Sequence, residues 1–242
     1  MNHHQTPVAL VTGASRGLGR AVAEELVWRG WRVVADARDG ERLARAVAAM
    51  PRPERVVAIP GDVADPGHRE RLADAVGGAG GLDLLVNNAS ALGPSPQPRL
   101  ADYPLAELER VYAVNVIAPL ALFQRMAPHL ERRAGRVVNV TSDASVEAYE
   151  GWGGYGSSKA ALDQVSAILG AEHPALRVYA FDPGDMATDM HQRAFPGEDV
   201  SDRPAPERVV PALMRLLSRD LPSGRYQAAD LAPPAGARRA AA

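Results

Sequence analysis

The chain has 242 residues, enough to bury a sizeable core in one α/β domain or in two smaller ones. Charged residues make up 23% of the chain and hydrophobic residues 46%, ordinary values for a globular protein that exclude wholesale disorder. The net charge of −2 gives no basic surface for nucleic acid or a membrane, and the absence of cysteine excludes disulfides, a thiol nucleophile and cysteine-ligated zinc.

Short β-branched runs alternate with helical patterns along the whole chain. Strands are predicted, in chain order, at residues 8–11, 32–35, 55–59, 82–86, 136–140, 177–181 and 224–228. Helices are predicted between them, at residues 17–29, 39–49, 66–76, 105–131, 155–170 and 206–219. Such apolar strands separated by helices indicate a parallel sheet covered on both faces. We therefore predict a Rossmann-like, doubly wound α/β fold of about seven strands with helices on both faces.

One domain is expected to span residues 1–242, because no repeat or composition break divides the chain. Its ends, residues 1–6 and 233–242, are predicted to be frayed tails. The Pro-rich stretches 94–104 and 183–211 are predicted to be loops, and the second is long for a compact domain. We expect residues 184–206 to form a loop on the substrate side of the site.

The apolar segments favour a cytoplasmic protein without membrane contact. Residues Met1 to Pro7 are polar and run directly into an apolar strand, unlike a secretory signal peptide. The longest apolar stretch, Val116 to Phe123, is far too short to cross a bilayer.

The segment after the first predicted strand, Thr12 to Gly19, has the composition of a phosphate-binding turn. Glycines let the backbone turn tightly and approach a pyrophosphate at the amino end of the next helix. Because the spacing is not that of the G-x-G-x-x-G fingerprint, a plain strand-to-helix turn is the alternative. The candidate cofactor-binding residues here are Gly13, Ser15, Arg16, Gly17, Leu18 and Gly19.

The end of the second predicted strand, Ala35-Asp36-Ala37-Arg38, bears on which nucleotide is bound. An acidic residue at this place holds the ribose 2′-OH of NAD, whereas arginine accommodates the 2′-phosphate of NADP. Arg38 and Arg16 could surround one phosphate together with Ser15. We therefore predict NADPH/NADP+, with NAD as the alternative if Asp36 points at the ribose.

Lys159 is the only lysine among 27 Lys and Arg residues, and it follows Tyr155 by four positions in a predicted helix. That spacing places both side chains on one helix face. An ammonium beside a phenol is expected to lower the tyrosine pKa from its usual value of about 10, which makes tyrosine a workable general acid–base. An exposed helix pair is the alternative.

Two further polar residues are candidate site residues. Ser142 follows the fifth predicted strand, where its hydroxyl could donate to a carbonyl oxygen as negative charge develops there. Asn115 interrupts an apolar helix face, and a buried amide without partners costs about 1–3 kcal/mol, so it is expected to have a specific role.

Taken in order, these motifs resemble the classical short-chain dehydrogenase/reductase family over about residues 7–228. The resemblance rests on TGASRGLG at 12–19, Asp62-Val63, Asn87-Asn88-Ala89-Ser90, Asn115, Ser142, Tyr155-x-x-x-Lys159 and Pro183-Gly184 with Thr188. Ser90 departs from the glycine that usually ends the N-N-A-G motif. Residues 222–227 lack the frequent Asp-Gly-Gly stretch, although the resemblance still implies a homodimer or homotetramer.

The resemblance implies a role for each matched residue. Tyr155 would be the general acid, Ser142 would position the substrate carbonyl, and Asn115 would hold a water in the proton relay. Lys159 would bind the nicotinamide ribose and tune Tyr155. The remaining cofactor contacts would come from Asp62 and Val63 at the adenine, Asn88 near the ribose, Thr188 at the carboxamide, and Ala89, Ser90, Pro183 and Gly184.

The segment from Asp143 to Trp152 carries three carboxylates and two aromatic residues. We hypothesise that it favours a substrate with an amine or several hydroxyls, the alternative being a solvated acidic rim. The candidate substrate residues are Asp143, Glu150, Trp152, Met186, Met190 and His191. No metal site is predicted, because nothing with ligand spacing accompanies His191.

The sequence thus predicts an NADPH-dependent ketone or aldehyde reductase, or the reverse alcohol dehydrogenase, acting on a small molecule. The bias towards alanine, arginine, glycine and proline is typical of a GC-rich genome and makes a tailoring enzyme of secondary metabolism plausible. The alternatives are a non-redox cyclase or dehydratase on the same scaffold and a cofactor-binding protein without turnover.

Overall fold

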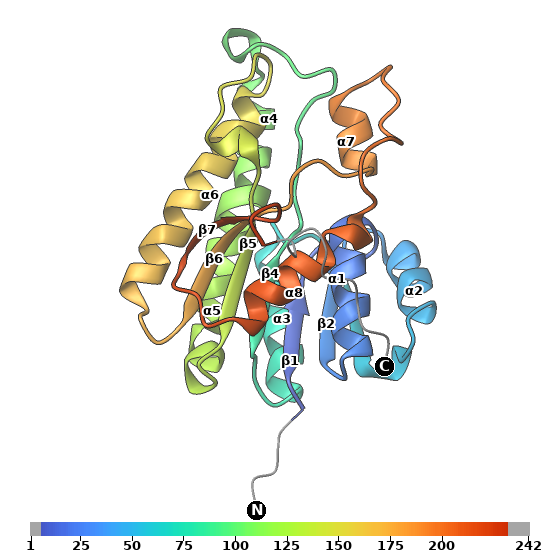
Figure 1. The fold of residues 1–242 in the computed structure, drawn as a ribbon, viewed down its shortest axis with the longest axis vertical. Helices are drawn as coiled ribbons and strands as arrows, with labels where there is room; N and C mark the ends of the chain where they lie inside the picture. Colours follow the sequence, from blue (N-terminus) through green and yellow to red (C-terminus); the bar gives the residue numbers. More distant parts are fainter. Residues whose placement is uncertain (1–5, 232–242) are drawn as a thin grey trace, which may run out of the picture.

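Seven parallel strands form one sheet in the computed structural model, which describes residues 6–231 (Figure 1). In sheet order β3-β2-β1-β4-β5-β6-β7, the strands are Val56–Pro60, Arg32–Ala37, Val8–Val11, Leu84–Asn87, Arg136–Val140, Arg177–Asp182 and Gly224–Gln227. The predicted fold is confirmed. Apart from the exposed Thr6, the two predicted tails lie outside the described residues.

Helices cover both faces of the sheet (Figure 1). One layer contains α1 (Gly17–Trp28), α2 (Gly40–Ala48) and α8 (Val210–Ser218), and the other contains α3 (Pro66–Gly78), α5 (Ala118–Arg132) and α6 (Gly153–Glu172). Short 3-10 turns occupy Pro53–Arg55, Leu100–Asp102, Asp143–Ser145 and Pro206–Arg208.

Alternate side chains of each central strand enter different cores. In β1, Ala9 and Val11 pack with α1 and α8, whereas Val8 and Leu10 pack with α3 and α5. Because both faces are buried, these strands are apolar throughout, which is why their sequence pattern was so clear. The edge strand β3 differs, since Val57 and Ala58 are exposed.

The predicted helix 105–131 is interrupted in the structure. It consists of α4 (Leu105–Tyr112), a π-helical turn (Ala113–Ile117) and α5. Pro119 has no N–H to donate to the carbonyl of Asn115, so regular α-helical bonding fails at this place. The π turn places Asn115 in a local widening of the helix, an arrangement found frequently at functional sites.

The predicted loop 183–211 contains a short helix, α7 (Asp189–Ala194), beyond the carboxyl ends of the strands (Figure 1). Thr188 caps this helix, because its hydroxyl accepts a hydrogen bond of 3.1 Å from the His191 amide. The combination of a capping threonine and Asp189 in the first turn was a helix-start signal that the loop prediction overlooked.

A row of buried polar side chains joins the strands that lead into the site. The Asn87 amide donates to Asn139 at 2.7 Å, and the Asn139 amide donates to the Ser166 hydroxyl at 2.8 Å. Ser166 in turn donates to the carbonyl of Leu162. This row ties β4, β5 and α6 together and so aligns the three elements that carry polar residues into the site.

We expect Asn139→Ala to lower the free energy of unfolding by about 2–4 kcal/mol, because it leaves a cavity and removes the partners of Asn87 and Ser166. Chemical denaturation measures this loss. The control is Gln164→Ala, an exposed change on α6 that should cost less than about 0.5 kcal/mol. Equal losses in the two variants would show that the buried row contributes little.

Candidate functional site

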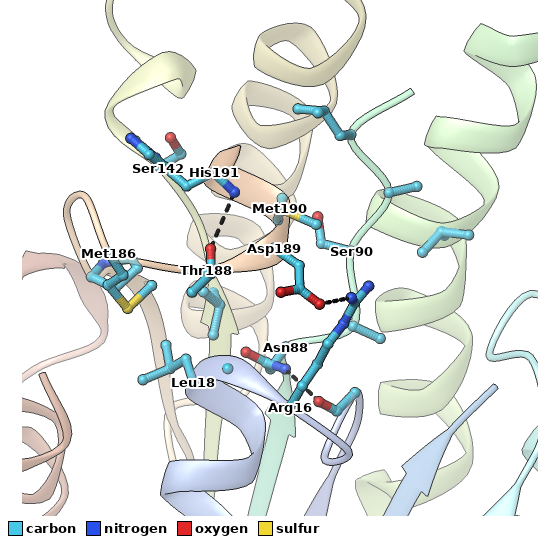
Figure 2. A pocket seen from close by; sticks show the side chains of 18 of the residues that line it. Arg16, Leu18, Asn88, Ser90, Ser142, Met186, Thr188, Asp189, Met190 and His191 are labelled. Atoms are coloured by element: carbon cyan, nitrogen blue, oxygen red, sulfur yellow. Dashed lines mark hydrogen bonds and ion pairs between the residues drawn. The ribbon is translucent and has the colours of Figure 1, made fainter. Parts of the chain in front are cut away.

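One continuous cavity of about 940 Å³ lies at the carboxyl ends of the strands, where the strand order reverses between β1 and β4. The segments that follow β1 to β6 all contribute to its wall, and α7 covers part of it (Figure 2). Ligands of doubly wound sheets bind at this reversal, because the crossovers on its two sides diverge and leave a crevice.

The turn after β1 forms the floor of the cavity. Gly13 and Gly17 have φ angles of +68° and +55°, which glycine adopts without steric cost. A Cβ at Gly19 would overlap the Asn88 amide and the carbonyl of Gly13. Among the described residues no side chain caps the start of α1, so its free N–H groups face an incoming anion. This cradle fits the pyrophosphate of a dinucleotide.

Asn88 holds this turn against the end of β4. Its side-chain amide donates to the carbonyl of Thr12 at 2.9 Å and of Gly13 at 3.3 Å, and its backbone N–H donates to the Thr12 hydroxyl. Asn88 therefore shapes the glycine turn through hydrogen bonds that the motif alone did not reveal.

The carboxylate of Asp36 is directed into the protein. The residue is 1% exposed, and its oxygens bond the Gly13 amide at 3.0 Å and Nε2 of the buried His68 at 2.6 Å. Arg38 is exposed and lines the same end of the cavity. The side chain after β2 that is free to meet a nucleotide is thus the arginine, not the aspartate.

The end of the cavity lined by Arg16 and Arg38 is called the nucleotide end below. Two of its residues were not predicted from the sequence. Arg42, in the first turn of α2, lines the cavity together with Arg16 and Arg38. Asp189 of α7 forms ion pairs with Arg16 and, at 3.4 Å, with Arg42 (Figure 2 shows the Arg16 pair). The position of Arg42, four residues beyond Arg38, was the available signal.

The other predicted cofactor residues also line the cavity. Asp62 accepts a hydrogen bond from the Ala64 amide at 2.9 Å, and the neighbouring Val63 is buried. The remaining lining residues that the motifs indicated are Ser15, Leu18, Ala89, Ser90, Pro183, Gly184 and Thr188.

Tyr155 and Lys159 are brought together at the other end of the cavity. Nζ of Lys159 donates to the carbonyl of Val140 at 2.7 Å and lies 5.5 Å from the centre of the Tyr155 ring. Lys159 is only 2% exposed, and Tyr155 is also buried. The exposed-pair alternative for these two residues is therefore wrong.

Burial dominates the titration of both groups. It raises the pKa of Tyr155 well above its usual value, although hydrogen bonds with Ser142 and Ser90 act in the opposite direction. It lowers the pKa of Lys159 to about 8, and the Asp163 charge partly opposes this shift. The expected net lowering of the Tyr155 pKa is therefore not found, because the loss of hydration outweighs the groups that favour the phenolate.

Ser142 lies next to Tyr155 and bonds its own neighbour. Its hydroxyl donates to the Asp143 carboxylate at 2.8 Å. The same carboxylate accepts hydrogen bonds from the Ala144 amide at 2.8 Å and from the Tyr149 hydroxyl at 3.1 Å. Asp143 thus keeps two donors if the serine turns towards a ligand.

Asn115 makes four hydrogen bonds although it is 1% exposed. Its Oδ1 accepts from the Ala91 amide at 2.8 Å and the Ser90 hydroxyl at 3.2 Å. Its Nδ2 donates to the carbonyl of Ala91 and the hydroxyl of Ser158, both at 2.9 Å. These bonds make Asn115 a link between α6 and the segment after β4, and the water-holding role that the resemblance implies stays a prediction.

Aromatic rings connect Tyr155 with the segment around α7. The ring centroid of Trp152 lies 5.8 Å from that of Tyr155 and 5.7 Å from that of Phe195. The ring centroids of Phe195 and His191 are 4.8 Å apart.

Met190 packs with Trp152 and Tyr155, whereas Met186 lines the cavity from the core that contains α1 and α8. Asp143 lines the cavity beside Ser142, and Asp185, missed in the sequence, lines it 3.8 Å from His191. Glu150 is not brought into the cavity, because it is exposed and pairs with Arg99 at 3.1 Å.

Within residues 6–231, no three His, Asp or Glu side chains are grouped so that they could hold a metal ion. Over the same range, no helix has the length and apolar character needed to cross a bilayer.

A family model described as short chain dehydrogenase matches residues 7–199. A rhamnolipid-biosynthesis 3-oxoacyl-[acyl-carrier-protein] reductase of Pseudomonas aeruginosa is 39% identical over 68% of this chain and 66% of its own, just under two thirds of its length. A 1-deoxy-11-beta-hydroxypentalenate dehydrogenase of Streptomyces arenae is 36% identical over 78% of this chain and 70% of its own length. An NADPH-dependent aldehyde reductase-like chloroplastic protein of Arabidopsis thaliana is 30% identical over 95% of this chain and 86% of its own length.

Solved structures agree with the whole fold. A short-chain dehydrogenase from Pseudomonas syringae has a TM-score of 0.86 and 29% identity, covering 92% of this chain and 94% of that one. One from Shigella flexneri, complexed with NADP, has a TM-score of 0.85 and 26% identity over 92% and 97%. An alcohol dehydrogenase from Thermococcus sibiricus, complexed with 5-hydroxy-NADP, has a TM-score of 0.82 and 26% identity over 92% and 95%.

The buried ammonium of Lys159 predicts a pH effect on stability. Its pKa of about 8 in the folded chain is below the unfolded value of 10.5, so between these values the unfolded chain binds more protons and this group's contribution to stability rises with pH. From about pH 7.5 to about pH 10, wild type should gain about 2 kcal/mol in free energy of unfolding relative to Lys159→Met. Denaturation of both proteins at both pH values measures the difference, and a constant difference would contradict the lowered pKa.

Proposed function

Because the chain belongs to the classical short-chain dehydrogenase/reductase family, we propose that it is an NADP(H)-dependent oxidoreductase that reduces a ketone or aldehyde, or oxidises the corresponding alcohol. The observation that carries the proposal is the convergence of Ser142, Tyr155 and Lys159 on the cavity that also contains the glycine turn. That cavity gives a dinucleotide and a small carbonyl compound adjoining positions.

In the proposed reduction, Tyr155 gives its phenolic proton to the carbonyl oxygen of the substrate. Burial keeps this tyrosine protonated at neutral pH, because it raises the pKa, and a general acid must start in that state. Ser142 turns from Asp143 and donates to the same oxygen as negative charge develops there. When bound, the nicotinamide cofactor supplies the hydride, or accepts it in the reverse reaction.

Lys159 has two tasks in this proposal. Its ammonium stabilises the Tyr155 phenolate that remains after proton transfer, and its donors are available to the nicotinamide ribose. With a pKa of about 8, the group is about nine-tenths protonated at pH 7. The hydrogen bond to the carbonyl of Val140 holds the ammonium in place.

Several observations support NADP rather than NAD as the cofactor. Both oxygens of Asp36 are engaged inside the protein, so this carboxylate does not compete for a ribose. Three arginines, Arg16, Arg38 and Arg42, line the nucleotide end, and guanidinium groups suit a 2′-phosphate. The Arabidopsis relative is named as NADPH-dependent, and the Shigella and Thermococcus neighbours were determined with NADP and 5-hydroxy-NADP.

We expect Arg38→Ala to weaken NADPH binding about tenfold, or about 1.4 kcal/mol, and NADH binding less than about threefold, because only NADPH carries the 2′-phosphate. Fluorescence titration with each nucleotide measures both constants. Arg20→Ala, on the exposed surface of α1, is the matched control and should leave both unchanged. Equal losses for the two nucleotides in Arg38→Ala would refute the phosphate assignment.

The charge distribution in the cavity supports a substrate that carries an amine or several hydroxyls. The arginines that line the cavity within residues 6–231 lie at the nucleotide end. Asp143 instead accepts a hydrogen bond from Tyr149, whose ring packs on Trp152. Asp185 lies 3.8 Å from His191, which packs on Phe195, and also 3.8 Å from Arg203. Carboxylates and aromatic faces both favour an ammonium group over a carboxylate. Glu150 does not contribute to this charge, because it is exposed and pairs with Arg99. We further propose a tailoring role in secondary metabolism, which the composition typical of a GC-rich genome supports.

The activity is tested by following NADPH absorbance with three ketones of similar size that carry an ammonium group, no charge or a carboxylate. We expect NADPH consumption, fastest with the ammonium ketone. Lys159→Arg should lower kcat about hundredfold, because a planar guanidinium does not replace a compact ammonium between Val140 and Tyr155. Arg20→Lys, equally charge-conserving but on the exposed surface of α1, is the control.

Other outcomes of this assay identify the alternatives. Loss of substrate without NADPH consumption would indicate a non-redox enzyme on the same scaffold. Nucleotide binding without any turnover would indicate a binding protein. Near-normal turnover by Lys159→Arg would contradict the role given to the ammonium.

A further inference from the structure

Asp189 of α7 reaches the nucleotide end of the cavity, and the proposed mechanism gives this carboxylate no role. One of its oxygens, Oδ2, accepts a hydrogen bond from Nη1 of Arg16 and lies 3.4 Å from Nη1 of Arg42 (Figure 2 shows the Arg16 pair). These are two of the three arginines that line the nucleotide end. A carboxylate of the protein thus occupies guanidinium groups that a 2′-phosphate would need.

The other acidic neighbour of these arginines is fixed in place. Asp39 lies 3.7 Å from Arg42, but it also caps α2, because its Oδ1 accepts a hydrogen bond of 2.9 Å from the backbone N–H of Arg42. Within residues 6–231, the carboxylate of Asp189 bonds the two arginines alone. Its side chain is 61% exposed, so water can solvate it when the arginines leave, and an exposed ion pair opens at little cost.

The helix α7 connects these arginines with the end of the cavity at Tyr155, here called the substrate end. Asp189 lies in the first turn of this six-residue helix, and the next residue, Met190, packs with Tyr155 and Trp152. The ring centroid of Phe195, directly after the helix, lies 5.7 Å from that of Trp152. A change in the ion pairs of Asp189 therefore acts on a helix that also contacts the substrate end.

We propose that Asp189 is a specificity-determining residue that exchanges partners with the nucleotide: the 2′-phosphate takes Arg16 and Arg42, and the released carboxylate frees the first turn of α7. The inference rests on the proposed function, because it needs these arginines to bind that phosphate. A phosphate ester carries a charge of about −1.5 to −2 and three acceptor oxygens, so guanidinium groups prefer it to a carboxylate. A nucleotide without the 2′-phosphate leaves the ion pairs intact.

The test uses the full-length protein and two probes, adenosine 2′,5′-bisphosphate and adenosine 5′-monophosphate, which differ only in the 2′-phosphate. Asp189→Asn removes the competing charge at an exposed position. It should lower the dissociation constant of the bisphosphate about three- to tenfold and change that of the monophosphate less than about twofold, as measured by calorimetry. The gain should shrink as the ionic strength rises from about 0.05 M to about 0.5 M, because salt screens exposed charges.

The matched control is Asp202→Asn. Asp202 is also exposed and pairs with an arginine, Arg203, at 2.7 Å, but it does not line the cavity. Both dissociation constants should keep their wild-type values in this variant.

Tryptophan fluorescence follows α7 through its contact with Trp152. In wild type, saturation with the bisphosphate should change the emission of Trp152, and saturation with the monophosphate should not. In Asp189→Asn neither probe should change it, because the first turn of α7 is already free. Trp152→Phe should remove the signal, since Trp28 and Trp31 lie at the carboxyl end of α1, opposite the glycine turn.

An unchanged or higher dissociation constant of the bisphosphate in Asp189→Asn would overturn the inference. It would also be overturned by a gain in affinity without any change of emission in wild type, by equal changes with both probes, or by a signal that persists in Trp152→Phe. A wild-type protein that binds the two probes equally well would instead overturn the NADP assignment on which the inference rests.

Discussion

The reversal of strand order between β1 and β4 is the constraint on which the rest of the molecule depends. The chain builds β1, β2 and β3 in one direction and then returns to place β4 on the other side of β1, so the connections on the two sides diverge. The crevice that results is where the glycine turn, Asn88 and the end of β5 meet. Hydrogen bonds from Asn88 to Thr12 and Gly13 close the gap between β1 and β4 below this crevice.

Burial of polar groups is the second theme, and it connects stability with the site. Asn87, Asn139 and Ser166 are joined by hydrogen bonds between β4, β5 and α6, although Oδ1 of Asn87 has no partner among the described residues. Asn115 has backbone and hydroxyl partners. Lys159 has the carbonyl of Val140 as its partner, yet burial still lowers its pKa. The site thus holds an ammonium and a phenol where neither charged form is well hydrated, and the local hydrogen bonds determine which charge is tolerated.

Much of the fold and of the site could be predicted from local patterns. The strands were clear because both of their faces are buried, and the glycine turn, Tyr155 and Lys159 are recognisable from spacing alone. Other features escaped because they depend on partners distant in the chain. The inward direction of Asp36 requires His68, the π turn at Asn115 required weighing Pro119 against a strong apolar period, and Arg42 comes to the cavity from a different element than Arg38.

The sequence by itself determined the order of the strands and of most helices along the chain, the membership of the chain in its family and most of the motif residues that surround the crevice, because these follow from periodicity and motif spacing. Only the tertiary structure decided which acidic side chains face the cavity and how the paired groups titrate. Glu150 turns outward to Arg99 while Asp143 stays beside Ser142. The pKa of Tyr155 is raised and not lowered as the sequence predicted, because hydration depends on the whole packed environment and not on the residue four positions away.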